Sequence, residues 1–257
     1  MAADDKPNMV DHARRRVFRT ADLPPEQRNA AWNEIAAPFF DHVVPLVDKT
    51  MDGEIECDLL GDWATCRICF NPHSYARREP HHAEAAFDHY FIQLYVRGSL
   101  HGECAGRGVY VRPGDILILD VRESSVLRTS SGEIITLIIP HATIDRLPAD
   151  LHGQVLRHEL PSTRRLAAQF ESLQARLAEV AGGDGIDPLQ STILDALRAA
   201  IDESIGQRVE PGSSGVLGEQ PTETRPEPAG GRAPGRSDPA PLRAVHDILL
   251  DWARRGD

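Results

Sequence analysis

The stretch GVYVRPGDILILD, residues 108–120, decides the fold. Two short runs of strand-forming residues, 109–111 and 116–119, flank the tripeptide Pro113-Gly114-Asp115. Proline fixes φ at the second position of a β-turn, and glycine accepts the positive φ that a type II turn needs at the third position. The stretch therefore predicts a β-hairpin, of the kind that closes small antiparallel barrels.

Further strand-like runs surround this stretch between residues 54 and 140. They are short, follow a period of two, and alternate with Gly, Pro, Ser and Asp: WATCRICF (63–70), DHYFIQLYVRG (88–98), VLRTSS (126–131) and EIITLIIP (133–140). Six or more strands at this spacing predict a barrel or a sandwich. The run IITLII, residues 134–139, is apolar almost throughout, so we expect both of its faces to be covered.

Helical patterns lie on both sides of the predicted barrel. Pro24 and Pro25 begin a helix that ends near Pro38 and turns Trp32 and Ile35 inward. The barrel with this helix occupies residues 21–150, and a helical hairpin occupies 151–206. Its first helix carries an apolar stripe with steps of four and three: Leu166, Phe170, Leu173, Leu177 and Val180.

The second helix of the hairpin begins with a capping-box pattern at Asp187, Pro188 and Gln190. It continues the stripe through Leu189, Ile193, Leu197, Ile201 and Ile205. An apolar stripe indicates that one face of the helix is buried, but it does not indicate what covers that face. The two stripes bury either against the chain's own barrel or against a second copy in a homodimer, with Leu166, Phe170, Leu173, Leu177 and Val180 as the candidate dimerisation residues.

The two ends of the chain have the composition of less ordered segments. Residues 1–20 are polar and predicted flexible, and residues 207–241 are a Pro- and Gly-rich disordered linker. A helical stripe returns in LRAVHDILLDWARRGD, residues 242–257. The start of the chain lacks a signal-peptide pattern, and no apolar run reaches the length of a membrane span. These observations predict a cytoplasmic protein with no membrane partner.

Charge and cysteine content exclude some classes of function. The formal net charge of −11 over 257 residues argues against a chain that grips nucleic acid by itself. The four cysteines, Cys57, Cys66, Cys69 and Cys104, are too few and too scattered for a disulfide framework, so we expect thiols. No P-loop, GxSxG, HExxH or dinucleotide fingerprint occurs.

One strand offers a mixed face that suits an organic ligand. Along HYFIQLYV, residues 89–96, one side carries Tyr90, Ile92, Leu94 and Val96, and the other carries His89, Phe91, Gln93 and Tyr95. Alternation alone leaves open which side is concave. The candidate ligand-binding residues are His89, Phe91, Gln93, Tyr95 and, from the predicted hairpin, Tyr110 and Arg112.

The barrel pattern with its Pro-Gly-Asp turn resembles the cupin fold, whose catalytic members hold a divalent ion with two His and a Glu on one strand and a later His. This chain departs from that pattern. It has no histidine between Gly102 and Pro140, and on the preceding strand only His89 is present, with Gln93 where a carboxylate is preferred. We therefore predict no catalytic residues, no metal and no cofactor. His81 with His82, and the Cys66-x-x-Cys69 pair, are weaker metal candidates.

Three stretches together resemble the N-terminal sensor domain of AraC-type transcriptional regulators. They are residues 18–40 (FRTADLPPEQRNAAWNEIAAPFF), residues 88–140 around the Pro-Gly-Asp turn, and the helical pair that begins LPSTRRLAAQF (160–170). The resemblance implies a mainly β fold with α: a cupin-like antiparallel β-barrel that binds an effector, followed by an amphipathic helical hairpin that mediates dimerisation. Residues 242–257 resemble the first helix of the family's helix-turn-helix domain, which implies a regulator truncated before most of that domain.

Two hypotheses for the function follow. The first is a regulatory domain, not an enzyme, that binds a small-molecule effector and couples it to a homodimer, with DNA contacted only through a missing C-terminal domain or a partner chain. A stand-alone sensor and a remnant of a regulator are variants of this hypothesis. The alternative is a metal-dependent cupin enzyme, an oxygenase or an isomerase.

Overall fold

Two antiparallel β-sheets form the centre of the protein. The computed structural model describes residues 15–60, 62–78, 89–144, 150–179 and 186–209. The larger sheet has the order β1 (Arg15–Arg19), β3 (Gly53–Leu60), β4 (Trp63–Phe70), β11 (Gly132–Pro140), β6 (His89–Arg97), β9 (Ile116–Asp120) and β12 (Gln154–Leu156). The smaller has the order β2 (His42–Pro45), β5 (His73–Arg77), β10 (Ser125–Thr129), β7 (Leu100–Cys104) and β8 (Arg107–Val111).

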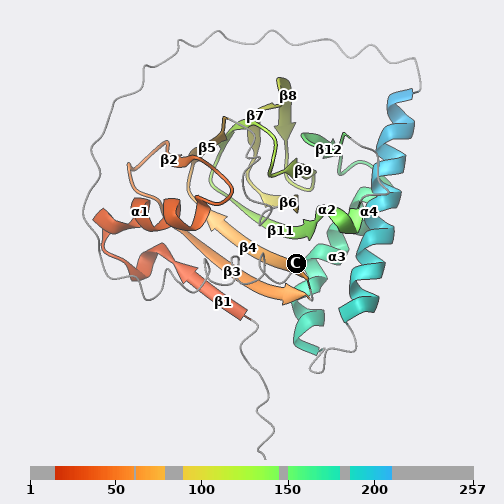
Figure 1. Ribbon diagram of the computed structural model, residues 1–257, viewed down its shortest axis with the longest axis horizontal. Coiled ribbons are helices and arrows are strands. Elements are labelled where there is room, and N and C mark those ends of the chain that lie inside the picture. The colour runs from red at the N-terminus through yellow and green to blue at the C-terminus, as the bar shows by residue number, and fades with distance from the viewer. Residues whose placement is uncertain (1–14, 61, 79–88, 145–149, 180–185, 210–257) are drawn as a thin grey trace, which may run out of the picture.

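The helices lie at opposite ends of this β-structure (Figure 1). A 3₁₀ turn, η1 (Thr20–Asp22), precedes α1 (Pro25–Ala36), which packs at one end. On the other side, the short α2 (His141–Ile144) follows β11, and α3 (Pro161–Glu179) and α4 (Ile186–Val209) pack side by side (Figure 1). The arrangement confirms the predicted fold class, a mainly β cupin-like barrel with a helical hairpin.

The turn in GVYVRPGDILILD has the predicted geometry, but the predicted hairpin is wrong. The Asp115 N–H donates to the Arg112 carbonyl at 3.0 Å, and Gly114 has a φ of +86°. The strands on either side do not pair: β8 pairs with β7, whereas β9 pairs with β6 and β12. The turn hydrogen bonds to Tyr95 of β6 through Gly114 N–H and Asp115 C=O, so the chain crosses from the smaller sheet to the larger.

Strand β11 is covered on both faces, as the apolar run at 134–139 predicted, and so is its neighbour β6. Every residue from 134 to 139 is buried. One face of each strand joins a core between the two sheets and α1, and the other joins a second core beneath α3 and α4. Register fixes this division, because Phe91 lies opposite Ile138 and Ile92 opposite Leu137. The larger sheet therefore separates two apolar layers.

The apolar stripes of the helical hairpin bury against the chain's own sheet. Leu166, Phe170 and Leu173 are fully buried in the second core, together with Ile193 and Leu197 of α4. Intramolecular packing thus accounts for these side chains, and a dimer through the hairpin would use its other faces. The side chains of Leu177 and Val180 lie outside the described part of the structure.

Two local expectations need correction. Residues 15–19, predicted flexible, form the edge strand β1, because Val17 and its neighbours pair with residues 54–58 of β3. Gln190 does not complete a capping box; its amide donates to the Leu60 carbonyl at 2.8 Å. Residues 1–14 and 210–257, which include most of the predicted linker and all of the predicted final helix, lie outside the described residues. Within the described residues, no helix is long and apolar enough to cross a membrane.

Removal of the Phe170 ring tests the second core. Phe170 is fully buried between the hairpin and the larger sheet, so Phe170→Ala leaves a cavity and should lower the free energy of unfolding by about 3–5 kcal/mol. Urea unfolding followed by circular dichroism measures this change. The neighbouring, exposed Glu171→Ala serves as the control. Equal stability of the two variants would contradict this packing.

Candidate functional site

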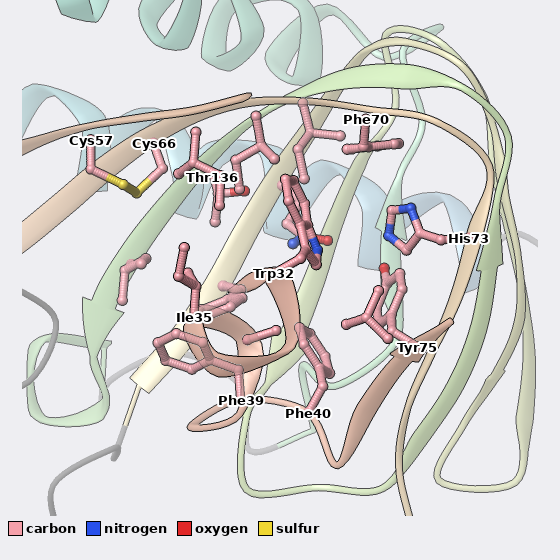
Figure 2. Close-up of a pocket in the computed structure, with 18 of the residues that line it drawn as sticks. Trp32, Ile35, Phe39, Phe40, Cys57, Cys66, Phe70, His73, Tyr75 and Thr136 are labelled. Carbon is pink, nitrogen blue, oxygen red and sulfur yellow. A yellow bond between two sulfur atoms is a disulfide. The ribbon is translucent and has the colours of Figure 1, made fainter. Parts of the chain in front are cut away.

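A cavity lies between α1 and the inner faces of the two sheets. Its volume, counted as the space open to the centres of water-sized spheres, is about 110 Å³. Aromatic and aliphatic side chains dominate its lining: Trp32, Ile35, Ala36, Phe39, Phe40, Val43, Ile55, Ile68, Phe70, Tyr75, Phe91, Tyr95, Ile134 and Ile138. Cys57, Cys66, His73, Gln93 and Thr136 complete it. Figure 2 shows Trp32 in the middle of this group, with Phe70, His73 and Tyr75 beside it.

Three of the six predicted ligand-binding residues line this cavity. Phe91, Gln93 and Tyr95 alternate along β6 and turn toward α1. Tyr90, Ile92 and Leu94 turn to the other face, beneath the hairpin. Alternation along the strand left open which side of β6 is concave. The structure shows that it is the side with Phe91, Gln93 and Tyr95.

The other three predicted residues do not line the cavity. Tyr110 is 53% exposed on β8, and the Arg112 guanidinium pairs with Glu159 at 2.7 Å. Both were assigned to the cavity because a hairpin was expected where the chain instead crosses between sheets. His89 lies at the start of β6, buried in the larger sheet.

His89 belongs to a separate buried polar cluster at this end of β6. Burial, with His141 nearby, lowers the pKa of His89 to about 4. The His141 ring stacks on Tyr90 at 3.9 Å, and its Nε2 lies 3.2 Å from the Asp120 carboxylate. Burial raises the pKa of Asp120, but hydrogen bonds from His141 and Arg122 outweigh it and hold the pKa well below its usual range.

The helix that forms one wall of the cavity is fixed at several points. The Arg77 guanidinium, buried on β5, donates to the carbonyls of Pro38 and Phe39, both at 2.7 Å, just beyond the end of α1. Within α1, the Asn33 amide exchanges two hydrogen bonds with the backbone of Val43. Trp32 and Ile35 thereby hold their expected inward orientation.

Several polar groups of the lining satisfy one another. The His73 Nδ1–H donates to the Asn71 carbonyl at 2.8 Å, and burial lowers the pKa of His73 to about 4, so the ring is neutral at pH 7. The hydroxyls of Tyr75 and Tyr95 hydrogen bond to each other. Burial raises the pKa of both tyrosines, so neither carries a charge near neutral pH.

The expectation that all four cysteines are thiols is wrong for two of them. Cys57 of β3 and Cys66 of β4 stand directly opposite in register and form a disulfide in the cavity wall (Figure 2). The sequence separates them by nine residues with a turn between, which is the arrangement of facing positions in a β-hairpin. Cys69 and Cys104 are free, and burial raises the pKa of the Cys104 thiol to about 12.

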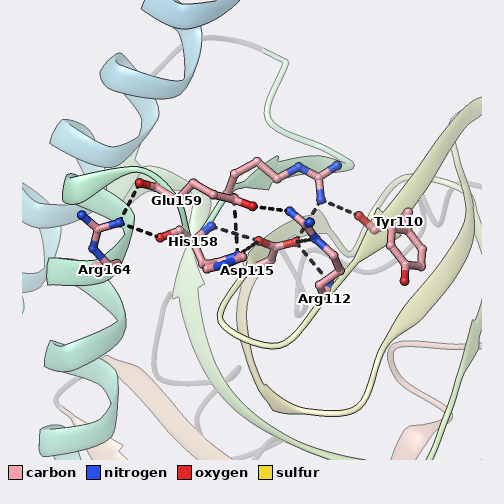
Figure 3. A network of polar contacts seen from close by, with 7 residues as sticks. Tyr110, Arg112, Asp115, His158, Glu159 and Arg164 are labelled. Atoms are coloured by element: carbon pink, nitrogen blue, oxygen red, sulfur yellow. Dashed lines mark hydrogen bonds and ion pairs between the residues drawn. The ribbon is translucent and has the colours of Figure 1, made fainter. Parts of the chain in front are cut away.

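A second polar network joins the Pro-Gly-Asp turn to the start of the helical hairpin (Figure 3). The Asp115 carboxylate, fully buried, accepts hydrogen bonds from the backbone N–H groups of Arg112 and His158 at 3.1 and 2.9 Å. It also accepts from the Arg157 guanidinium at 2.9 Å. Burial raises the pKa of Asp115, but these bonds and one from the His158 ring outweigh it and hold the pKa below its usual value.

This network also contains the ligand atoms that a cation would need. Oxygen and nitrogen atoms of Asp115, His158 and Glu159 lie within 4.8 Å of one another. The guanidinium groups of Arg157 and Arg112 already pair with Asp115 and Glu159. This group is therefore an ion-pair network. Of the predicted metal candidates, His81 and His82 fall outside the described residues, and Cys66 is bonded to Cys57 instead of facing Cys69.

Sequence reasoning did not assign several polar or aromatic lining residues to the cavity, among them Trp32, His73, Tyr75 and Thr136, although two signals were present. Thr136 is the single polar residue within IITLII, and it lies opposite Gln93 in register. His73 and Tyr75 alternate on β5 in the same way as Phe91 and Gln93 on β6. Trp32 was expected to turn inward, but no pattern indicated that it faces a cavity.

Comparison with known proteins assigns the family. The family model of the AraC-binding-like domain matches residues 32–202. The chain belongs to this family. An AraC-binding-like domain is a regulatory ligand-binding domain. Among the described residues, aromatic side chains line the cavity between α1 and the sheets.

Two solved structures are similar to this chain, to different extents. The AraC-like transcriptional activator CuxR superposes with a TM-score of 0.66 at 21% identity, covering 73% of this chain and 70% of that one. KdgF from Halomonas sp. matches 40% of this chain and 92% of its own, with 17% identity and a TM-score of 0.27. No curated protein matches the sequence significantly.

Acidification tests the buried neutral state of His73. An unfolded histidine has a pKa near 6.5, whereas that of His73 is about 4 in the folded domain. The unfolded state therefore binds the proton first, and stability that is complete above pH 6.5 falls as the pH decreases toward 4. Between pH 7 and pH 5, wild type should lose about 2 kcal/mol more unfolding free energy than His73→Phe. Urea titrations at both pH values measure this difference, and equal losses would refute it.

Proposed function

We propose that this chain is the effector-binding domain of an AraC-type transcription regulator, with a small molecule held in the cavity between α1 and the sheets. The observation that carries the proposal is this cavity, closed by α1 on one side and lined by eight aromatic or imidazole rings, in a chain of the AraC-binding-like family. Pockets of mainly apolar walls with a few polar groups are the usual form of small-molecule sites.

The role we propose is regulatory and not enzymatic. A cupin metal centre needs several imidazole and carboxylate ligands directed at one point. Among the described residues that line the cavity there is one histidine, His73, and no carboxylate. His73 already uses Nδ1 to bond Asn71. No observation favours the oxygenase or isomerase alternative.

A continuous set of hydrogen bonds supports coupling between the cavity and the helical hairpin. The Tyr95 ring lines the cavity, and the Tyr95 backbone bonds to both Gly114 and Asp115 of the turn. The Asp115 carboxylate in turn holds Arg157 and His158, which directly precede α3. A ligand that displaces Tyr95 thus acts on the position of α3, provided that it binds the two arrangements with different affinity.

The assembly that this coupling would control is a homodimer through the hairpin. Because the apolar stripe is buried within the chain, the dimer contact would use the exposed faces of α3 and α4, where Arg164, Arg165, Asp195 and Asp202 lie. We further propose a cytoplasmic location, and DNA contact only through a helix-turn-helix domain or a partner chain, because the acidic chain is unsuited to bind DNA alone.

A pair of neighbouring alanines tests the location of the effector. Ala36 lines the cavity, whereas Ala37 is exposed. Fragments that bind wild type in ligand-observed NMR should lose binding to Ala36→Phe, whose ring fills the cavity, and keep it with Ala37→Phe. Fragments that bind both variants equally well would show that the effector site lies elsewhere.

Asp115 tests the coupling. Asp115→Asn removes the charge that holds Arg157, so a bound fragment should keep its Kd but lose its effect on the sedimentation coefficient of the protein. Arg157→Gln, a milder change, should act in the same direction if Asp115→Asn fails to fold. Asp150→Asn breaks an exposed ion pair with Arg107 and serves as the control. A fragment effect that persists in both test variants would refute the coupling.

A further inference from the structure

The cavity has no counter-charge for an ionic ligand. Lys, Arg, Asp and Glu are absent from its described lining. Its titratable members are neutral at pH 7, because His73 has lost its proton and Tyr75 and Tyr95 retain theirs. Burial of a charge without a partner costs several kcal/mol. These walls therefore favour an uncharged molecule.

Aromatic rings from α1, from the segment that follows it and from both sheets contact one another along the cavity wall. The rings of Phe39 and Phe91 are 4.8 Å apart, and those of Phe40 and Tyr75 are 4.6 Å apart. Trp32 of α1 contacts His73 edge-on at 6.4 Å (Figure 2). Rings prefer offset or edge-to-face neighbours at such distances. The cavity wall therefore offers ring faces and edges that a further planar ring could pack against.

The volume favours a ligand of about the size of a single ring. One water needs about 10–15 Å³ on this measure, and an apolar cavity of about 150 Å³ in another protein holds benzene. The 110 Å³ here are of the same order. A ring with a small substituent is therefore the size of ligand that we test.

Two buried polar atoms in the lining lack hydrogen-bond partners. They are Oε1 of Gln93 and Oγ1 of Thr136, on residues that are 4% and 1% exposed. The two residues stand directly opposite on β6 and β11. An unpaired buried acceptor or hydroxyl costs about 1–3 kcal/mol. The amide oxygen needs a donor, and the hydroxyl can donate to an acceptor.

We propose that the cavity binds an uncharged, single-ring aromatic compound bearing a carboxamide-like group that reaches Gln93 and Thr136. Such a group presents a donor and an acceptor side by side, and it serves the Gln93 amide in either orientation. The inference rests on the proposed function, since it names the chemical class of the effector for the same cavity.

Benzamide and benzoate form the test pair, because they have nearly the same shape and differ in charge at pH 7.5. Calorimetric titration of the full chain should give benzamide a Kd at least tenfold below that of benzoate. Benzoate binding equal to or tighter than benzamide, or no benzamide binding at all, would overturn the proposed ligand class.

Variants of the two polar residues test the contact. Gln93→Leu and Thr136→Val should each weaken benzamide binding about tenfold and leave binding of toluene, which lacks the polar group, unchanged. Their melting temperatures should not fall, because each change removes an unpartnered buried polar atom. Gln154→Leu is the matched control, since Gln154 also has an unpartnered buried amide nitrogen but does not line the cavity. Equal benzamide affinity in Gln93→Leu, Thr136→Val and Gln154→Leu would refute the contact.

The outcomes separate this inference from the proposed function. If charged compounds bind and Ala36→Phe blocks them, the ligand class is wrong but the cavity remains the effector site. If benzamide and toluene bind wild type and Ala36→Phe alike, the effector site itself is wrong.

Discussion

The larger sheet must have both of its faces covered, and the rest of the structure depends on this constraint. Strands β6 and β11 are apolar on both sides, so exposure of either face would leave a row of isoleucine and leucine side chains in water. The helix α1 and the smaller sheet cover one face, and α3 with α4 covers the other. The cavity and the helical hairpin are consequently neighbours across one layer of backbone.

The hydrogen bonds of the Pro-Gly-Asp turn supply a direct route around this layer. The same short segment touches Tyr95 through its backbone and the start of the hairpin through the Asp115 side chain. A buried carboxylate with this many donors is rigid, because loss of any donor leaves part of its charge uncompensated. This arrangement is the basis of the coupling proposed above between the cavity and the hairpin.

Helices and strands were predicted well where a short stretch of sequence is enough to indicate them. Pro24 and Pro25 mark the start of α1, and the 134–139 run indicates a doubly covered strand. Pairing partners were harder to predict, because the turn residues fix the local φ and ψ angles but do not say which strand lies alongside. That limit produced the incorrect hairpin and, through it, the misplacement of Tyr110 and Arg112. The disulfide and the pairing of Gln93 with Thr136 depend on register, which becomes visible only when the strands are aligned.

The alternation along β6 and β11 has an evolutionary consequence. Residues at odd positions of β6 contact the ligand side, while their even-numbered neighbours support the hairpin. Mutations at the first set can alter which molecule is recognised while the surfaces that hold the helices stay intact. For the proposed effector site, this division would let ligand specificity diversify without changes to the face that packs against the hairpin.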